Sequence, residues 1–175
     1  SFLQSLQPSF SWQEYSGKLN IYDIESDSWI DSELEFTERA YHNIHCYNDK
    51  IYILGGKKLS TNRVFEYLQN EVEVYDENRD TILIDYTNPH QAANFASFLY
   101  KDNLLVMGGS VKLDINKEKI YTGDVHLYDL KTGYWYKLKD MPHAKETKGI
   151  LINDKIYLFG GFNKAALKEV ETYDL

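Results

Sequence analysis

The chain has 175 residues, of which 43% are apolar, so it can bury a core of its own as an ordered globular protein. Its formal net charge of −8 argues against a nucleic-acid or anionic-membrane partner, because proteins bind both of these through clustered lysine and arginine residues. No apolar run approaches the ~20 residues of a membrane helix, and Ser1 opens no signal segment, so we expect a soluble span whose compartment stays unknown.

From Lys18 onward the chain contains a recurring hairpin pattern, whereas residues 1–17 suggest only an irregular or edge segment. In this pattern an apolar strand ends in Tyr-Asp, a short polar turn follows, and a second strand begins seven residues after the tyrosine. The copies are Tyr22 with Trp29, Tyr75 with Ile82, Tyr128 with Trp135, and Tyr173, whose hairpin stops at Leu175.

Three further apolar strands each follow a turn signal and end in a pair of glycines. Their sequences are DKIYILGG, KDNLLVMGG and DKIYLFGG, and their glycine pairs are Gly55-Gly56, Gly108-Gly109 and Gly160-Gly161. The first glycines are 53 and then 52 residues apart. A fixed period near fifty residues predicts a repeat architecture.

Each repeat contains one more apolar stretch before its glycine-pair strand, which gives four strands in all. The strands at 51–54 and 156–159 are apolar at successive positions, and this favours burial on both faces. Four antiparallel strands in a unit of that length are typical of a propeller blade. The polar stretches after the glycine pairs, residues 57–70, 110–123 and 162–168, are predicted as loops.

The glycine pairs, tyrosines and tryptophans resemble the kelch repeat, in which they end the second strand, end the third and open the fourth. Ile82 departs from this pattern, since a tryptophan is expected there. The resemblance covers about residues 18–175 and implies an all-β, kelch-type β-propeller segment of four-stranded antiparallel blades. It also implies that most of these aromatic residues fill the space between blades.

The resemblance divides the chain into parts of one propeller domain. These are residues 18–38, the last two strands of a blade; 39–90 and 91–142, two complete blades; and 143–175, three strands of a further blade. Kelch propellers close a ring of six or so blades, so this span supplies about three to three and a half. We expect a longer chain or a second subunit to supply the rest, because open blade faces and strand edges favour association.

Function is expected at the rim that carries the glycine-pair loops, where a non-enzymatic module would bind a protein or peptide partner. Arg39 is the strongest candidate, because a guanidinium can hold a carboxylate of an acidic partner bidentately. The candidates are Arg39, Lys57, Asn62, Arg63, His90, Gln91, Lys112, His143, Lys145, Glu146, Asn163 and Lys164.

Two enzymatic alternatives and one structural alternative stay open. Some kelch-like propellers are sugar mutarotases, and Arg39, His42, His143 and Glu146 would serve as candidates for an acidic sugar. Others are copper oxidases with a linked cysteine and tyrosine, for which only Cys46 with Tyr47 or Tyr41 is available. The third is a structural domain carried by a larger enzyme. We predict no cofactor and no metal, since His42 and His45 would point to opposite faces of a strand.

Overall fold

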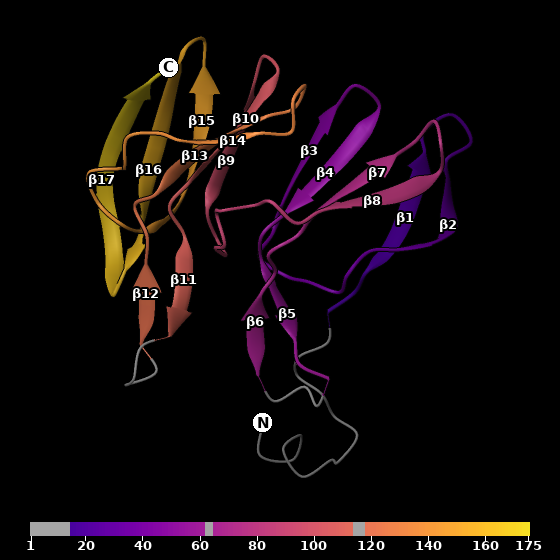
Figure 1. Cartoon of the computed structure of the whole chain (residues 1–175), viewed down its shortest axis with the longest axis horizontal. Coiled ribbons are helices and arrows are strands. Elements are labelled where there is room, and N and C mark those ends of the chain that lie inside the picture. Colours follow the sequence, from indigo (N-terminus) through magenta and orange to yellow (C-terminus); the bar gives the residue numbers. More distant parts are fainter. Residues whose placement is uncertain (1–14, 62–64, 114–117) are drawn as a thin grey trace.

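The computed structural model describes residues 15–61, 65–113 and 118–175, and these residues form strands and turns without a helix. Most of the irregular segment predicted at residues 1–17, as well as Asn62 and Arg63, therefore lies outside the described residues. Four of the six antiparallel sheets that these residues form follow one another along the chain and fan out side by side (Figure 1).

The two central sheets are four-stranded meanders. The first has the order β3-β4-β7-β8 and the second β9-β10-β13-β14. Their strands are β3 (Asn43–Tyr47), β4 (Lys50–Leu54), β7 (Val72–Asp76), β8 (Thr81–Asp85), β9 (Ala96–Tyr100), β10 (Asn103–Met107), β13 (Val125–Asp129) and β14 (Trp135–Lys137).

The two outer sheets are smaller. They comprise β1 (Lys18–Asp23) with β2 (Ser28–Glu35), and β15 (Glu146–Ile152), β16 (Lys155–Asn163) and β17 (Ala165–Asp174). The first strands β3, β9 and β15 contact one another in sequence order, β3 with β9 and β9 with β15. Sheets whose first strands meet while their last strands diverge are the blades of a propeller.

The core lies between blades rather than within one. Leu104 and Val106 on one face of β10 join the cluster shared with β4 and β7, whereas Leu105 and Met107 on the other face join the cluster shared with β16. Burial on both faces explains why this strand lacks alternation. Strand β16 differs from the prediction: Ile156 and Leu158 are buried, but Phe159 is 55% exposed, because no further sheet among the described residues covers that face.

The glycine pairs let each blade approach the next. Gly55 and Gly56 have φ angles of 66° and 86°, and the Gly56 N–H donates to the Ala92 carbonyl at 3.0 Å. A Cβ on Gly55 would lie 2.3 Å from the Phe95 ring, so only glycine fits without a shift. In the last blade, β16 continues through Gly160 and Gly161 with a register shift instead of ending there.

The stretches predicted as loops form β-hairpins instead. Residues 57–68 contain β5 (Lys57–Leu59) and β6 (Glu66–Leu68), which pair as the first ribbon. Residues 110–121 contain β11 (Ser110–Leu113) and β12 (Lys119–Tyr121), which pair as the second ribbon. Both ribbons leave their blades at the same rim, and the β16–β17 turn reaches that rim too (Figure 1).

Candidate interaction surface

A segment that we call the lead-in connects each blade to the next. It contacts the third strand of the blade that it enters, and we call this contact the root of that blade. The three lead-ins are residues 36–42, 86–95 and 138–145. Each meets a buried or largely buried polar residue of the blade's third strand, two positions before the repeat tyrosine: Glu73, His126 and Glu171. The same kind of contact therefore recurs in all three blades.

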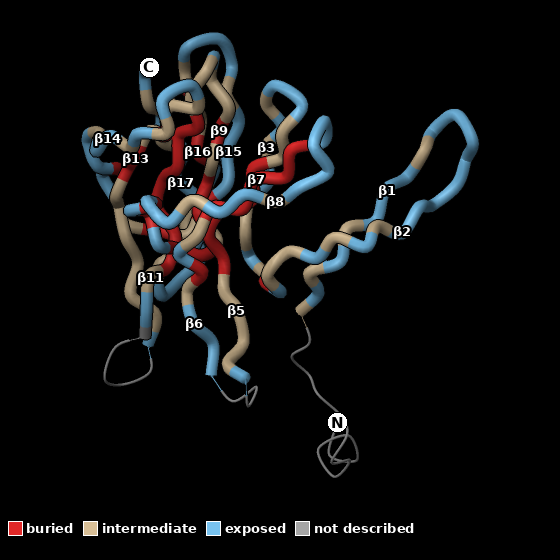
Figure 2. Tube along the Cα trace, turned by 45° about the vertical axis from the view of Figure 1, so that its right-hand side comes forward, coloured by how far each residue is buried: buried red, intermediate tan, exposed pale blue. Residues whose placement is uncertain are grey.

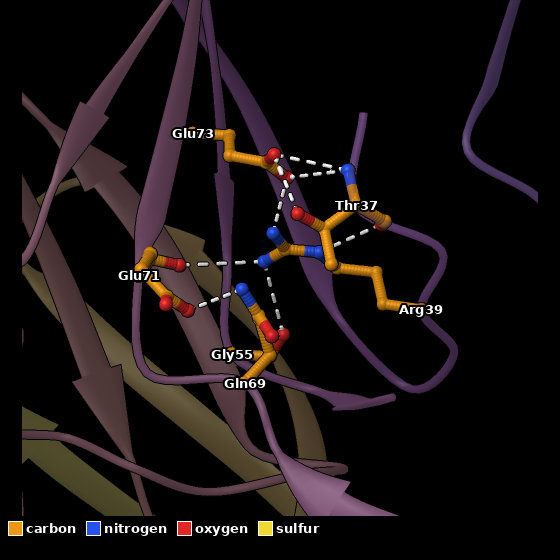
Figure 3. Close-up of polar contacts among 6 residues, drawn as sticks. All are labelled: Thr37, Arg39, Gly55, Gln69, Glu71 and Glu73. Carbon is orange, nitrogen blue, oxygen red and sulfur yellow. Dashed lines mark hydrogen bonds and ion pairs between the residues drawn. The ribbon is translucent and has the colours of Figure 1, made fainter. Parts of the chain in front are cut away.

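At the first blade the contact is an ion pair between Arg39 and Glu73, both buried (Figure 3). Thr37 donates to the same carboxylate from its backbone N–H and its hydroxyl, each at 2.9 Å. The guanidinium also donates to the carbonyls of Gly55 at 3.4 Å and Glu71 at 3.3 Å. Burial lowers the pKa of Arg39, and the Glu73 carboxylate opposes that shift.

At the second blade the contact is a pair of imidazoles. Nδ1 of His90 lies 3.0 Å from Nδ1 of His126, and Nε2 of His90 lies 3.0 Å from the carbonyl oxygen of Gly108. A carbonyl only accepts, so His90 carries its proton on Nε2 and accepts at Nδ1 from His126. Burial lowers the pKa of His90 to about 4, the nearby His126 adds to the shift, and burial lowers the pKa of His126 as well.

At the third blade two lead-in side chains share one carboxylate. Nζ of Lys145 lies 3.2 Å from Oε2 of Glu171, and Nδ1 of His143 lies 2.6 Å from Oε1. Lys145 is 1% exposed, whereas the His143 side chain is 72% exposed. The three blades thus use a guanidinium, an imidazole and an ammonium at the same point of the repeat.

A groove of about 790 Å³ separates the two ribbons. Strand β6 lies on one side and β11 on the other, and the ribbons stand in the order β12, β11, β6, β5 in Figure 1, with the same relation of β11, β6 and β5 in Figure 2. The groove is lined by Lys57, Lys58, Phe65, Glu66, Tyr67, Leu68, Asn70, Glu71, Ser110, Val111, Lys112 and Lys119.

The second ribbon and the β16–β17 hairpin contact each other directly. The rings of Tyr121 and Phe162 are 6.2 Å apart, and Nζ of Lys164 lies 2.9 Å from a Glu118 carboxylate oxygen. Glu146 at the start of β15 also accepts from Lys119 at 2.9 Å. These contacts hold one side of the groove against the third blade.

The structure divides the candidate residues into two groups. The binding role predicted for Arg39, His90 and Lys145 does not fit their positions, because all three are buried and contact groups of this chain. Of the others, Lys57 and Lys112 line the groove; Gln91 and Lys112 line a hollow beside it; and His143, Glu146, Asn163 and Lys164 contact the third blade or second ribbon.

The residues considered for catalysis are not gathered in one place. Arg39 and His42 line a 270 Å³ crevice between the first two sheets, but His143 and Glu146 do not line it. Cys46 is exposed and free, and the Tyr47 hydroxyl donates to Asp102 at 2.7 Å. Within the described residues, no group of three or more His, Cys, Asp or Glu could hold a metal ion.

Sequence reasoning missed the third-strand partners, although a signal for them exists. The strands VEVYD, VHLYD and VETYD each place a polar residue two positions before the tyrosine, in a strand otherwise rich in apolar residues. Such a residue needs a polar partner when its strand is buried. The sequence contains no comparable signal for the groove. It lies between two hairpins, and the sequence of these hairpins predicts loops.

The described part of the chain contains no helix that is long and apolar enough to cross a membrane. The blades and their meeting first strands define the chain as a segment of a β-propeller. It is similar in fold to the solved structure of YjhT, with a TM-score of 0.67 at 16% identity, covering 88% of this chain and 48% of that one.

The chain is also similar in sequence to kelch-repeat proteins. The chain is 23% identical over 160 residues to human (Homo sapiens) Kelch repeat and BTB domain-containing protein 12, and 24% identical over 147 residues to Kelch-like protein 40 of Xenopus tropicalis. These matches cover 85% and 81% of the chain but only 26% and 21% of the relatives. No protein-family model matches. These relatives are kelch-repeat proteins, and they support the kelch-repeat family that the repeats of the sequence predicted.

Proposed function

We propose that this propeller segment is a binding module that holds a protein or peptide partner at the ribbon-bearing rim. The observation that carries the proposal is that two successive blades extend hairpins from the same rim and leave a groove between them. The first ribbon exposes Phe65 and Tyr67, at 58% and 54%. Exposed aromatic side chains beside a groove are characteristic of contact surfaces. The kelch-repeat relatives support a role in protein interaction.

A pair of matched positions tests which rim binds. Tyr67 lies on the ribbon, and Tyr134 lies in the turn between β13 and β14, 67% exposed, at the opposite rim. We expect a photo-crosslinking amino acid at position 67, but not at position 134, to give discrete adducts in cells. Adducts from position 134 alone, or none from position 67, would contradict the rim assignment.

We also propose that further blades, from a longer chain or a second subunit, complete the ring. The outward faces of the end sheets support this, because Trp29 is 70% exposed and Phe159 and Val170 are 55% and 54% exposed. We expect this span to self-associate at micromolar concentration in sedimentation experiments, and the association to weaken when Phe159 is changed to Lys. A stable monomer that binds no dye for apolar surfaces would contradict this.

A further inference from the structure

The groove between the ribbons has a free strand edge on each side. Within the part of the chain that the structure describes, β6 pairs only with β5, whereas β11 pairs with β12 and, at Ser110, also bridges Ala93 of the second lead-in. Strand β6 therefore keeps one edge without a sheet partner, as does β11 beyond Ser110, and the two strands lie on opposite sides of the groove (Figure 1). Free edges are templates for another extended segment, whose backbone can continue their hydrogen bonding.

The charge of the groove is opposite to that of the chain. Four lysines and two glutamates line it, which gives a formal charge of +2 in a chain of net charge −8. Lys57 pairs with Glu66 at 3.2 Å, and Lys119 pairs with Glu146 at 2.9 Å. Lys58 and Lys112, one from each ribbon, have no ion-pair partner among the described residues. Two ammonium groups thus remain for carboxylates that come from outside.

The groove also offers apolar contact at strand spacing. Phe65 lies just before β6 and Tyr67 lies within it. They are two residues apart in extended chain, so their side chains point to the same side of the first ribbon, and Val111 lines the facing strand. An extended segment with side chains alternating between its two faces can place apolar groups against these rings. Its acidic groups can then reach the two lysines.

We propose that this groove binds an extended acidic segment of the partner by strand addition. Its backbone pairs with the edge of β6 or β11, its carboxylates meet Lys58 and Lys112, and its apolar side chains lie against Phe65 and Tyr67. This inference rests on the proposed function, because it specifies the partner chemistry of the same rim.

The test uses a labelled peptide in which glutamate alternates with valine, followed by fluorescence anisotropy. Two control peptides replace glutamate with lysine or place prolines along the segment to prevent strand pairing. The protein variants are Lys58→Glu/Lys112→Glu and a matched pair outside the groove, Lys139→Glu/Lys168→Glu. All four lysines are at least partly exposed, so the fold should tolerate both pairs, which thermal unfolding checks.

We expect the acidic peptide to bind, the groove variant to weaken that binding by at least about tenfold, and the matched variant to leave it unchanged. Both control peptides should bind at least about tenfold more weakly than the acidic one. Equal binding of the acidic and proline peptides would overturn strand addition, and insensitivity to the groove variant would overturn the site. If adducts still form at position 67 while the acidic peptide fails to bind, the proposed function stands and this inference fails.

Discussion

The roots of the first two blades are built at the same point of the repeat but with different chemistry. The first contains the ion pair of Arg39 and Glu73, and the second contains the imidazole pair of His90 and His126. Both pairs join a lead-in segment to the third strand of a blade, and both are buried. A polar contact between the lead-in and the third strand thus occurs in both blades, but it is an ion pair in one and a neutral pair in the other.

This difference determines which change disrupts each contact most. A buried ion pair is costly to break, because the remaining charge stays in a poorly solvated place. A neutral imidazole pair has a smaller electrostatic energy, yet it depends on protonation, since one nitrogen must accept from the other. The first root should therefore be sensitive to mutation, and the second to acid.

The largest expected effect comes from removing the guanidinium of the first root. Arg39→Ala leaves Glu73 buried without its cation, so we expect the free energy of unfolding to fall by about 3–5 kcal/mol. Urea unfolding measures it. Arg79→Ala is the matched control, because Arg79 lies 3.8 Å from Asp76 but its side chain is 72% exposed. A similar small loss in both variants would show that the Arg39 pair contributes little.

The next largest effect is a pH dependence of the free energy of unfolding that arises from the imidazole pair of the second root. The pKa of His90 is about 4 in the folded chain, below the ordinary value of 6.5, so the unfolded chain binds the proton more readily. The stabilisation is complete above pH 6.5, is lost as the pH falls towards 4, and changes no further below that. The total is roughly 3 kcal/mol for this residue.

The measurement is the free energy of unfolding at a series of pH values between 7 and 4, for the parent chain and for His90→Gln/His126→Gln. The variant should lose less stability over this window than the parent does. His143→Gln is the control, since its side chain is mostly exposed. Parallel curves for the parent chain and the double variant would show that the imidazole pair does not cause the loss.

The strands could be predicted from the sequence because each of their landmarks recurs at a fixed spacing. Gly55, Gly108 and Gly160 mark the second strands, and the repeat tyrosines mark the third. The sequence indicates that Glu73 needs a polar partner, but not that this partner is Arg39, 34 residues away, so the role of Arg39 could not be predicted. The ribbons were not predicted for a related reason. Lys57, Lys58 and their neighbours do not alternate between apolar and polar residues, so nothing in the local sequence indicates that they form paired strands.

The smallest expected effect separates the two side chains that share Glu171 in the third root. Lys145→Met keeps the apolar stem but removes the buried ammonium, so we expect a loss of about 1–2 kcal/mol in the free energy of unfolding. His143→Ala should change it by no more than about 0.5 kcal/mol, because an exposed partner is largely replaced by water. Urea unfolding of both variants at pH 7 tests this order. If His143→Ala costs as much as Lys145→Met, burial does not decide which lead-in contact matters, and the comparison of the first two roots loses its physical basis.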